Sequence, residues 1–224
     1  MPTRSTSAPD GGIVLAGGAS RRMGSAKAAL EWEGRTLLDR VVGTLGRAVD
    51  GPVVVAAAPG GALPPLHSTP PQRWHRVDDP VADRGPLTGL ATALVAHAAG
   101  SAPPELVFVS AVDLPLLSVE LVRRILALLR AAPDVDVALP RIDGRAQPLA
   151  AAWRTRTTSD VLLRSQRGEG GFRDLLGSLR VMELDREALL ADPVLRAVDP
   201  ALDGFRDVDD PLALANLRAD RPPR

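Results

Sequence analysis

The sequence predicts a single α/β domain, in which a mostly parallel, Rossmann-like sheet carries helices on both faces. Two observations predict this fold class. Short apolar runs alternate along the chain with segments of helical apolar spacing, and 224 residues suffice for one sizeable domain but are few for two. We expect the domain to span residues 11–224, after a polar tail of residues 1–10 that we expect to be disordered.

The expected strands are short runs rich in Val, Leu and Ala. The run LVFVSAV is the most strongly apolar and stops at Asp113. In chain order, the expected strands are residues 12–16, 52–56, a weaker strand ending over 76–80, and then 106–112, 135–139 and 149–153.

The expected helices carry apolar residues three and four positions apart. Ser118 is a suitable N-cap for one of them. The apolar residues are Leu37, Leu38, Val41, Val42 and Leu45 in 36–48, Leu90, Leu94 and Ala98 in 86–99, and Leu121, Ile125 and Leu129 after Ser118. Beyond residue 154 the pattern is less regular, with a short excursion over 168–176 and a closing helix over 211–218.

Composition excludes several classes of function. Basic and acidic residues number 27 each, so no charge excess indicates a nucleic-acid or membrane surface. The chain has no cysteine, which excludes disulfides, thiolate catalysis and cysteine-ligated metals. It shows neither an apolar stretch of membrane-spanning length nor a signal peptide. We therefore expect a cytoplasmic enzyme.

A glycine-rich turn follows the first strand directly, where residues 15–27 read LAGGASRRMGSAK. Gly17 and Gly18 let the backbone turn sharply towards a ligand, while Arg21, Arg22 and Lys27 add the positive charge that suits a triphosphate. Lys27 is the only lysine of the chain, and its compact ammonium is not equivalent to arginine in a tight phosphate site. The pattern is neither the Walker nor the Rossmann motif, and such a turn alone is more often structural than functional.

A longer pattern surrounds this turn. Residues 15–30, LAGGASRRMGSAKAAL, resemble the signature LAGGxSxRMGxxKxxL of nucleotidyltransferases similar to molybdenum cofactor guanylyltransferase. Further segments resemble those of that family in the same order, and the resemblance covers about residues 12–218. They are DDP at 78–80, GPLTGL at 85–90, VDLP at 112–115, QPLAAAW at 147–153 and FRDVDDP at 205–211.

The resemblance implies a fold like that of the nucleotide-diphospho-sugar transferases, and it implies roles for particular residues. The nucleotide would be bound by Leu15, Ala16, Gly17, Gly18, Arg22, Lys27, Asp79 and Asp113. Lys27 and Asp113 would be the catalytic residues, and Asp113 would bind Mg²⁺. Asp209 stands where many of these guanylyltransferases have Asn, so it is a candidate second ligand of Mg²⁺.

The position of Asp113 supports a role in binding Mg²⁺ independently of the resemblance. Asp113 ends a central strand, where open α/β sheets bind ligands, and Mg²⁺ prefers one or two carboxylates together with phosphate oxygens. Each of the three carboxylates also has a structural explanation. Asp113 could instead simply start the turn before Pro115. Asp79 could open a turn before Pro80, and Asp209 could cap the closing helix. Arg164 and Arg167, near a flexible glycine-rich stretch, are candidates for contacts with an anionic pterin.

The reaction implied by the resemblance joins GTP and molybdenum-bearing molybdopterin to give the guanine dinucleotide cofactor and pyrophosphate. The attacking phosphate is already ionised near neutral pH, so no general base is required, and the sequence offers no obvious one. The LAGG sequence favours GTP over CTP, because the cytidylyl-transferring branch typically reads xAAG. The alternatives are a cytidylyltransferase, a transferase for another phosphorylated acceptor, and a non-catalytic GTP-binding relative. Proteins that handle the molybdenum cofactor are possible partners.

Overall fold

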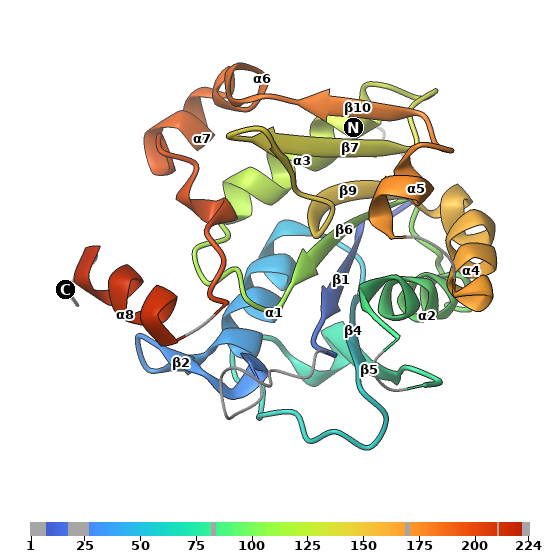
Figure 1. Cartoon of the computed structure of the whole chain (residues 1–224), viewed down its shortest axis with the longest axis horizontal. Coiled ribbons are helices and arrows are strands. Elements are labelled where there is room, and N and C mark those ends of the chain that lie inside the picture. Colours follow the sequence, from blue (N-terminus) through green and yellow to red (C-terminus); the bar gives the residue numbers. More distant parts are fainter. Residues whose placement is uncertain (1–7, 18–26, 82–83, 169–170, 210, 221–224) are drawn as a thin grey trace, which may run out of the picture.

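The computed structural model describes residues 8–17, 27–81, 84–168, 171–209 and 211–220. One mixed, mostly parallel sheet forms its centre (Figure 1). From edge to edge, its strands are β10 (Val181–Leu184), β7 (Val137–Ile142), β9 (Ala150–Arg154), β6 (Leu106–Ala111), β1 (Gly11–Leu15), β4 (Val53–Ala57) and β5 (Trp74–Asp78). Only β9 in this order is antiparallel to its neighbours, and the short β8 (Arg145–Ala146) pairs with β7. The predicted fold class is confirmed.

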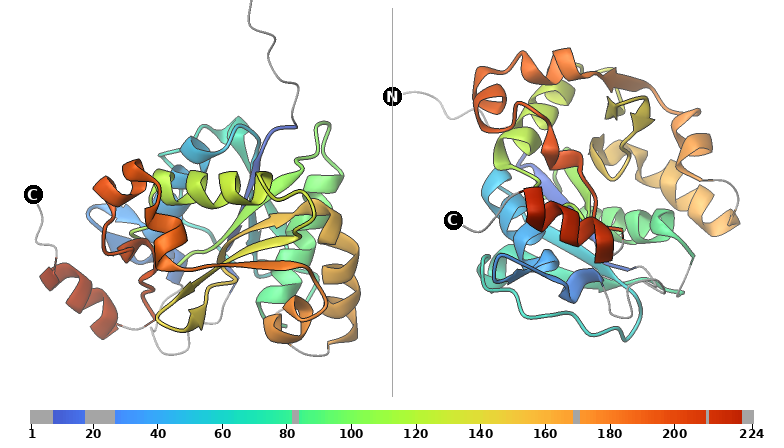
Figure 2. Two further views of the ribbon diagram at one scale, coloured as in Figure 1. Left: turned by 90° about the horizontal axis from the view of Figure 1, so that it is seen from above. Right: turned by 60° about the vertical axis from the view of Figure 1, so that its left-hand side comes forward.

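Alternating side chains of the central strands pack into two separate hydrophobic cores, because successive residues of a strand point to opposite faces of the sheet. Val14 and Phe108 pack with helices α1 (Leu37–Ala48) and α3 (Val119–Arg130) on one face. Ile13 and Val109 pack on the other face with α2 (Pro86–Ala98) and α4 (Thr158–Arg167). Figures 1 and 2 show these helices on the two sides of the sheet.

Capping residues fix where the helices begin. Thr36 accepts a hydrogen bond from the Asp39 amide at 3.2 Å, and α1 starts at the next residue. Ser118 accepts one from the Leu121 amide at 3.1 Å, as its sequence context predicts, and α3 follows. No helix in the described ranges is both long and apolar enough to cross a membrane.

Several elements were not expected from the sequence. A two-stranded hairpin, β2 (Glu31–Trp32) and β3 (Arg35–Thr36), precedes α1, and its turn residues Glu33 and Gly34 both have positive φ. Helices α6 (Arg186–Leu190) and α7 (Pro193–Val198) were not expected either. In contrast, α8 (Pro211–Asp220) confirms the expected closing helix over 211–218, and α5 (Phe172–Leu176) lies in the expected excursion over 168–176. The third strand begins at Trp74 and ends at Asp78, two residues before the predicted end.

The expected disordered tail of residues 1–10 lies largely outside the described residues. At its end, the carbonyl of Asp10 accepts a hydrogen bond from the Gly51 amide at 2.7 Å, and its carboxylate pairs with Arg130. The surrounding backbone and Arg130 thus hold Asp10 in place, and disorder of residues 1–7 stays a prediction.

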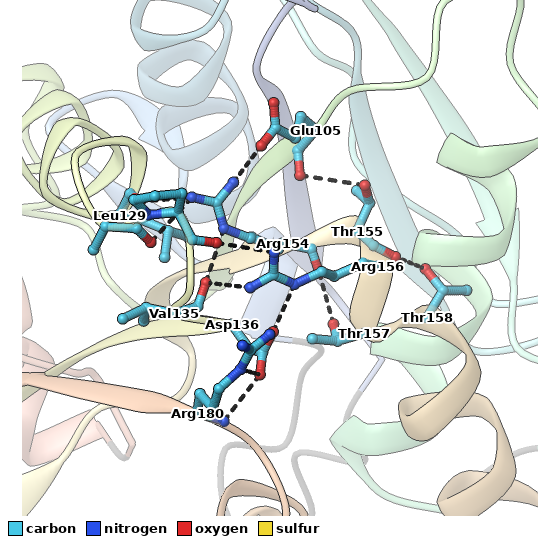
Figure 3. A network of polar contacts seen from close by, with 12 residues as sticks. Glu105, Leu129, Val135, Asp136, Arg154, Thr155, Arg156, Thr157, Thr158 and Arg180 are labelled. Carbon is cyan, nitrogen blue, oxygen red and sulfur yellow. Dashed lines mark hydrogen bonds and ion pairs between the residues drawn. The ribbon is translucent and has the colours of Figure 1, made fainter.

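A polar network ties together the edge of the sheet where β7 begins and β9 ends (Figure 3). The guanidinium of Arg154 is buried and donates to the carbonyls of Leu129, Ala132 and Val135. The carboxylate of Asp136 accepts hydrogen bonds from Arg156 at 2.7 Å and from the backbone and side chain of Arg180. Since β1, β4, β5 and β6 all begin on this side, the network stabilises the edge opposite their carboxyl ends.

Candidate functional site

The carboxyl ends of four parallel strands meet at one edge of the sheet. Beyond β1 the pairing continues, since the Ala16 amide donates to the Ala56 carbonyl at 2.8 Å and the Val112 amide donates to the Leu15 carbonyl at 3.3 Å. The strands lie in the order β6, β1, β4 and β5, and Gly17, Asp79 and Asp113 stand within two residues of the ends of β1, β5 and β6. This is the edge where open α/β sheets bind ligands.

Gly17 is a position where the structure leaves no ordinary room for a side chain. A Cβ atom there would lie 3.2 Å from the Ala58 amide nitrogen and 3.3 Å from Oδ2 of Asp79. Glycine at this position therefore lets the turn approach Asp79 closely. The predicted nucleotide ligands Gly18 and Arg22, together with Arg21, lie outside the described residues.

The Asp79 carboxylate is held at this edge with part of its hydrogen-bonding capacity unused. Its amide donates to the Ala57 carbonyl at 2.9 Å, whereas its Oδ1 is buried and finds no partner among the described residues. Burial raises the pKa of Asp79 above its usual value; an interaction with the Thr92 side chain opposes this shift, and the charge of Asp78 adds to it. A buried acceptor without a partner costs folding free energy, so its persistence favours a role in contacting a ligand.

Gly89 brings the GPLTGL segment up to the same carboxylate. A Cβ atom on Gly89, in the first turns of α2, would lie 3.5 Å from Oδ2 of Asp79 and 3.3 Å from a methyl group of Leu15. Residues 15–17 and 85–90, which both belong to segments that resemble family motifs, thus converge on Asp79.

Lys27 joins two carboxylates that are distant in the sequence. Its Nζ, on the short 3-10 helix η1 (Lys27–Ala29), donates to Oδ2 of Asp113 at 2.7 Å and to Oδ1 of Asp209 at 2.6 Å. The Val208 amide donates to the Asp113 carbonyl at 2.9 Å, and this bond fixes the closing segment of the chain against the end of β6. Three residues that the sequence singled out are therefore brought into direct contact.

The ion pairs determine the charge state of Lys27. Partial burial disfavours its charge, but the hydrogen bonds to Asp113 and Asp209 outweigh this effect, so the pKa of Lys27 lies above its usual value. The Lys27 and Asp113 side chains are only 21% and 16% exposed, whereas Asp209 is 63% exposed. The contact with Asp113 is therefore the better shielded from solvent and the stronger of the two.

Asp207 is a residue of this site that sequence reasoning missed. Partial burial, and then the charges of nearby Asp209 and Asp113, raise the pKa of Asp207 above its usual value. Asp207 and Asp209 are both exposed and flank the buried Val208, so they lie on the same side of the segment. That spacing was the signal that could have identified Asp207.

The donor set at this edge fits a magnesium ion that also binds phosphate. In the described ranges, no three His, Cys, Asp or Glu side chains are arranged to hold a metal by themselves. Mg²⁺, however, commonly takes one or two carboxylates and completes its coordination with water and phosphate oxygens. The Asp113 and Asp209 carboxylates already contact one cation, the Lys27 ammonium, from two sides, so both could contribute an oxygen to a metal ion bound between them.

One of the two arginines expected near the pterin lies beside the same edge. A cavity of about 150 Å³ lies between the start of α2 and the end of α4, where the Ser165 hydroxyl donates to the Thr88 hydroxyl at 3.2 Å. Arg84 and Arg164 line this cavity, whereas Arg167 is exposed and does not. Positive charge thus lies close to the first turn of α2, whose backbone amides also favour anions.

The sequence of the chain is similar to those of known NTP transferases. Residues 12–184 match the family model of the MobA-like NTP transferase domain. The chain is 40% identical over 186 residues to a probable molybdenum cofactor guanylyltransferase of Mycobacterium tuberculosis, a match that covers 81% of this chain and 87% of the relative. A similarly described protein of Mycobacterium avium is 42% identical over 146 residues, or 64% of this chain and 68% of its own.

Solved structures share the fold. Molybdopterin-guanine dinucleotide biosynthesis protein A from Archaeoglobus fulgidus superposes with a TM-score of 0.69 at 19% identity, covering 94% of this chain and 97% of its own. A 2-C-methyl-D-erythritol 4-phosphate cytidylyltransferase from Thermus thermophilus gives a TM-score of 0.60, also at 19% identity, and covers 93% and 97%. At these identities the likeness establishes the nucleotidyltransferase fold and not the substrate.

Proposed function

The chain belongs to the MobA-like NTP transferase family, and from this membership we propose that it transfers GMP from GTP to molybdenum-bearing molybdopterin. The products are the guanine dinucleotide cofactor and pyrophosphate. The observation that carries this proposal is the convergence of Lys27, Asp113 and Asp209 at the strand edge that also holds Gly17 and Asp79.

The chemistry requires little covalent help from the protein. An oxygen of the acceptor's terminal phosphate attacks the α-phosphorus of GTP, and a new P–O bond forms. The bond from that phosphorus to the bridging oxygen breaks, and the electron pair leaves with pyrophosphate. The attacking phosphate is ionised near neutral pH, so positioning and charge neutralisation are the main tasks of the site.

The residues of the site divide these tasks between them. In this proposal, the Lys27 ammonium neutralises negative charge on the triphosphate, and the backbone of residues 15–17 contacts the nucleotide. Asp113 and Asp209 would hold the magnesium ion, which when bound offsets the charge of the triphosphate and of the leaving pyrophosphate.

Asp79 supports guanine as the base. A carboxylate can accept hydrogen bonds from both N1–H and the 2-amino group of guanine, whereas the pairing edge of cytosine offers only its 4-amino group as a donor. The buried Oδ1 of Asp79, without a partner among the described residues, has the acceptor capacity that this contact needs. On the acceptor side, we propose that Arg164 and Arg84 bind an anionic group of molybdopterin.

Pyrophosphate release tests the proposal. The protein is incubated with Mg²⁺ and molybdenum-loaded molybdopterin, with GTP and CTP in parallel reactions. We expect release with GTP, a loss of about 100-fold or more in kcat for Asp113→Asn, and no loss for Asp160→Asn, an exposed residue at the start of α4. A preference for CTP would indicate a cytidylyltransferase instead. Binding of GTP and Mg²⁺ without release would indicate a non-catalytic relative.

A further inference from the structure

The ammonium of Lys27 occupies the place between two carboxylates where the donor set fits a metal ion. Its contacts of 2.7 Å to Asp113 and 2.6 Å to Asp209 are short, charge-assisted hydrogen bonds. An ammonium has three N–H donors, and these contacts use two of them. In this arrangement Lys27 has at most one donor left for a phosphate group.

The surrounding charge does not favour a bare triphosphate. Lys27 supplies one positive charge between the carboxylates of Asp113 and Asp209, and the Asp207 carboxylate belongs to the same segment as Asp209. Among the described residues of this cluster, a triphosphate would therefore meet more negative than positive charge. A divalent cation between the carboxylates reverses that balance, and it also repels the ammonium that lies there.

We propose that Lys27 and the divalent cation exchange places: the metal enters between Asp113 and Asp209 and displaces the ammonium, which then contacts the triphosphate. The exchange rests on the proposed function in one respect, namely that catalysis uses a divalent cation. Asp209 is the residue that makes this exchange involve two carboxylates, because Asn at position 209 would leave the ammonium paired with the Asp113 carboxylate alone.

The single lysine of the chain allows a direct test in the unmodified protein. Full-length protein grown with lysine labelled with ¹³C at Cε gives one lysine side-chain signal, that of Lys27. We expect MgCl₂, added without nucleotide, to shift this signal, and NaCl at equal ionic strength to leave it in place. In Asp113→Asn, MgCl₂ should no longer shift it. A lysine signal that saturating Mg²⁺ does not move overturns the proposal.

Metal affinity supplies a second, independent readout. Binding of Mn²⁺ without nucleotide is measured by electron paramagnetic resonance for the parent protein and for Lys27→Met, which removes the competing ammonium. At an effective dielectric constant near 20, two charges about 4 Å apart interact strongly, and solvent reduces the effect, so we expect the dissociation constant to fall by about tenfold or more.

The matched control is Arg196→Met, which removes a positive charge from exposed Arg196 on α7 and should leave Mn²⁺ affinity unchanged. Equal or weaker Mn²⁺ binding by Lys27→Met overturns the exchange. Neither measurement uses GTP or molybdopterin, so the exchange can hold even if another nucleotide is the donor. Conversely, if pyrophosphate is released from GTP but Mg²⁺ does not shift the lysine signal, the proposed function is supported and the exchange is refuted.

Discussion

Replacing Asp136 with Asn removes the carboxylate that joins Arg156 to Arg180 at the edge of the sheet opposite the candidate site. Burial alone would raise the pKa of Asp136, but the hydrogen bonds from Arg180 and Arg156 outweigh it and lower the pKa from 3.8 to about 2. Each pKa unit corresponds to about 1.4 kcal/mol, so the charged carboxylate stabilises the fold by about 2 kcal/mol.

The sign of the pH dependence follows from the lowered pKa. Above about pH 4 the carboxylate is charged in both the folded and unfolded states, and the full stabilisation is present. As the pH falls from about 4 towards about 2, the unfolded state takes up its proton first, and the stabilisation is lost. Below that range the parent protein carries a neutral group at this position, as the Asn variant does at every pH.

Urea unfolding of the parent and of Asp136→Asn, followed by circular dichroism at a series of pH values, measures this effect. We expect a difference in the free energy of unfolding of about 2 kcal/mol at pH 7 that shrinks towards zero as the pH approaches 2. The matched control is Glu183→Gln, which breaks an exposed pair with Arg141 and should cost less than about 1 kcal/mol. A difference for Asp136→Asn that does not change with pH would refute the assigned role of its charge.

Three further predictions concern the site and the fold. Gly17→Ala should lower kcat/KM, because the new Cβ would lie 3.3 Å from Oδ2 of Asp79; unchanged kinetics would show that the turn can move aside. Asp79→Asn should raise the KM for GTP by roughly tenfold or more and reduce the preference for GTP over ITP, which lacks the 2-amino group; steady-state kinetics with both nucleotides test this. Ser118→Ala should lower the free energy of unfolding by about 1 kcal/mol through loss of the cap on α3, and a thermal melt unchanged from the parent would contradict this.

The central elements could be predicted because local sequence and tertiary burial agree there. Strands β1 and β6 are continuous apolar runs buried on both faces, and Ser118 marks the start of α3 unambiguously. The missed elements lack this agreement. In α4 only Val161 is buried, and in the edge strand β10 only Leu184 is, so neither presents a clear periodic pattern. The hairpin turn places Glu33 at positive φ, which its residue type does not suggest.

Much of the candidate site could also be anticipated, because motif resemblance and the rule for strand ends both point to Asp113. The contacts themselves could not be anticipated. Lys27 meets carboxylates 86 and 182 residues further along the chain, and no local pattern encodes such a pairing. Asp207 joins them only because the Val208 amide holds the closing segment against the end of β6.

The hydrogen bond from the Val208 amide to the Asp113 carbonyl affects the order in which the sheet and the candidate site form. The segment that matches the family model ends at residue 184, before Asp207 and Asp209. During synthesis, the strands of the sheet emerge from the ribosome before these two carboxylates do. A chain that stopped after residue 204 would retain every strand of the described ranges and still carry the family's signature, but it would lack the second carboxylate that holds Lys27. Folding of the sheet therefore precedes assembly of the site, because a segment that follows all of these strands in the sequence supplies part of it.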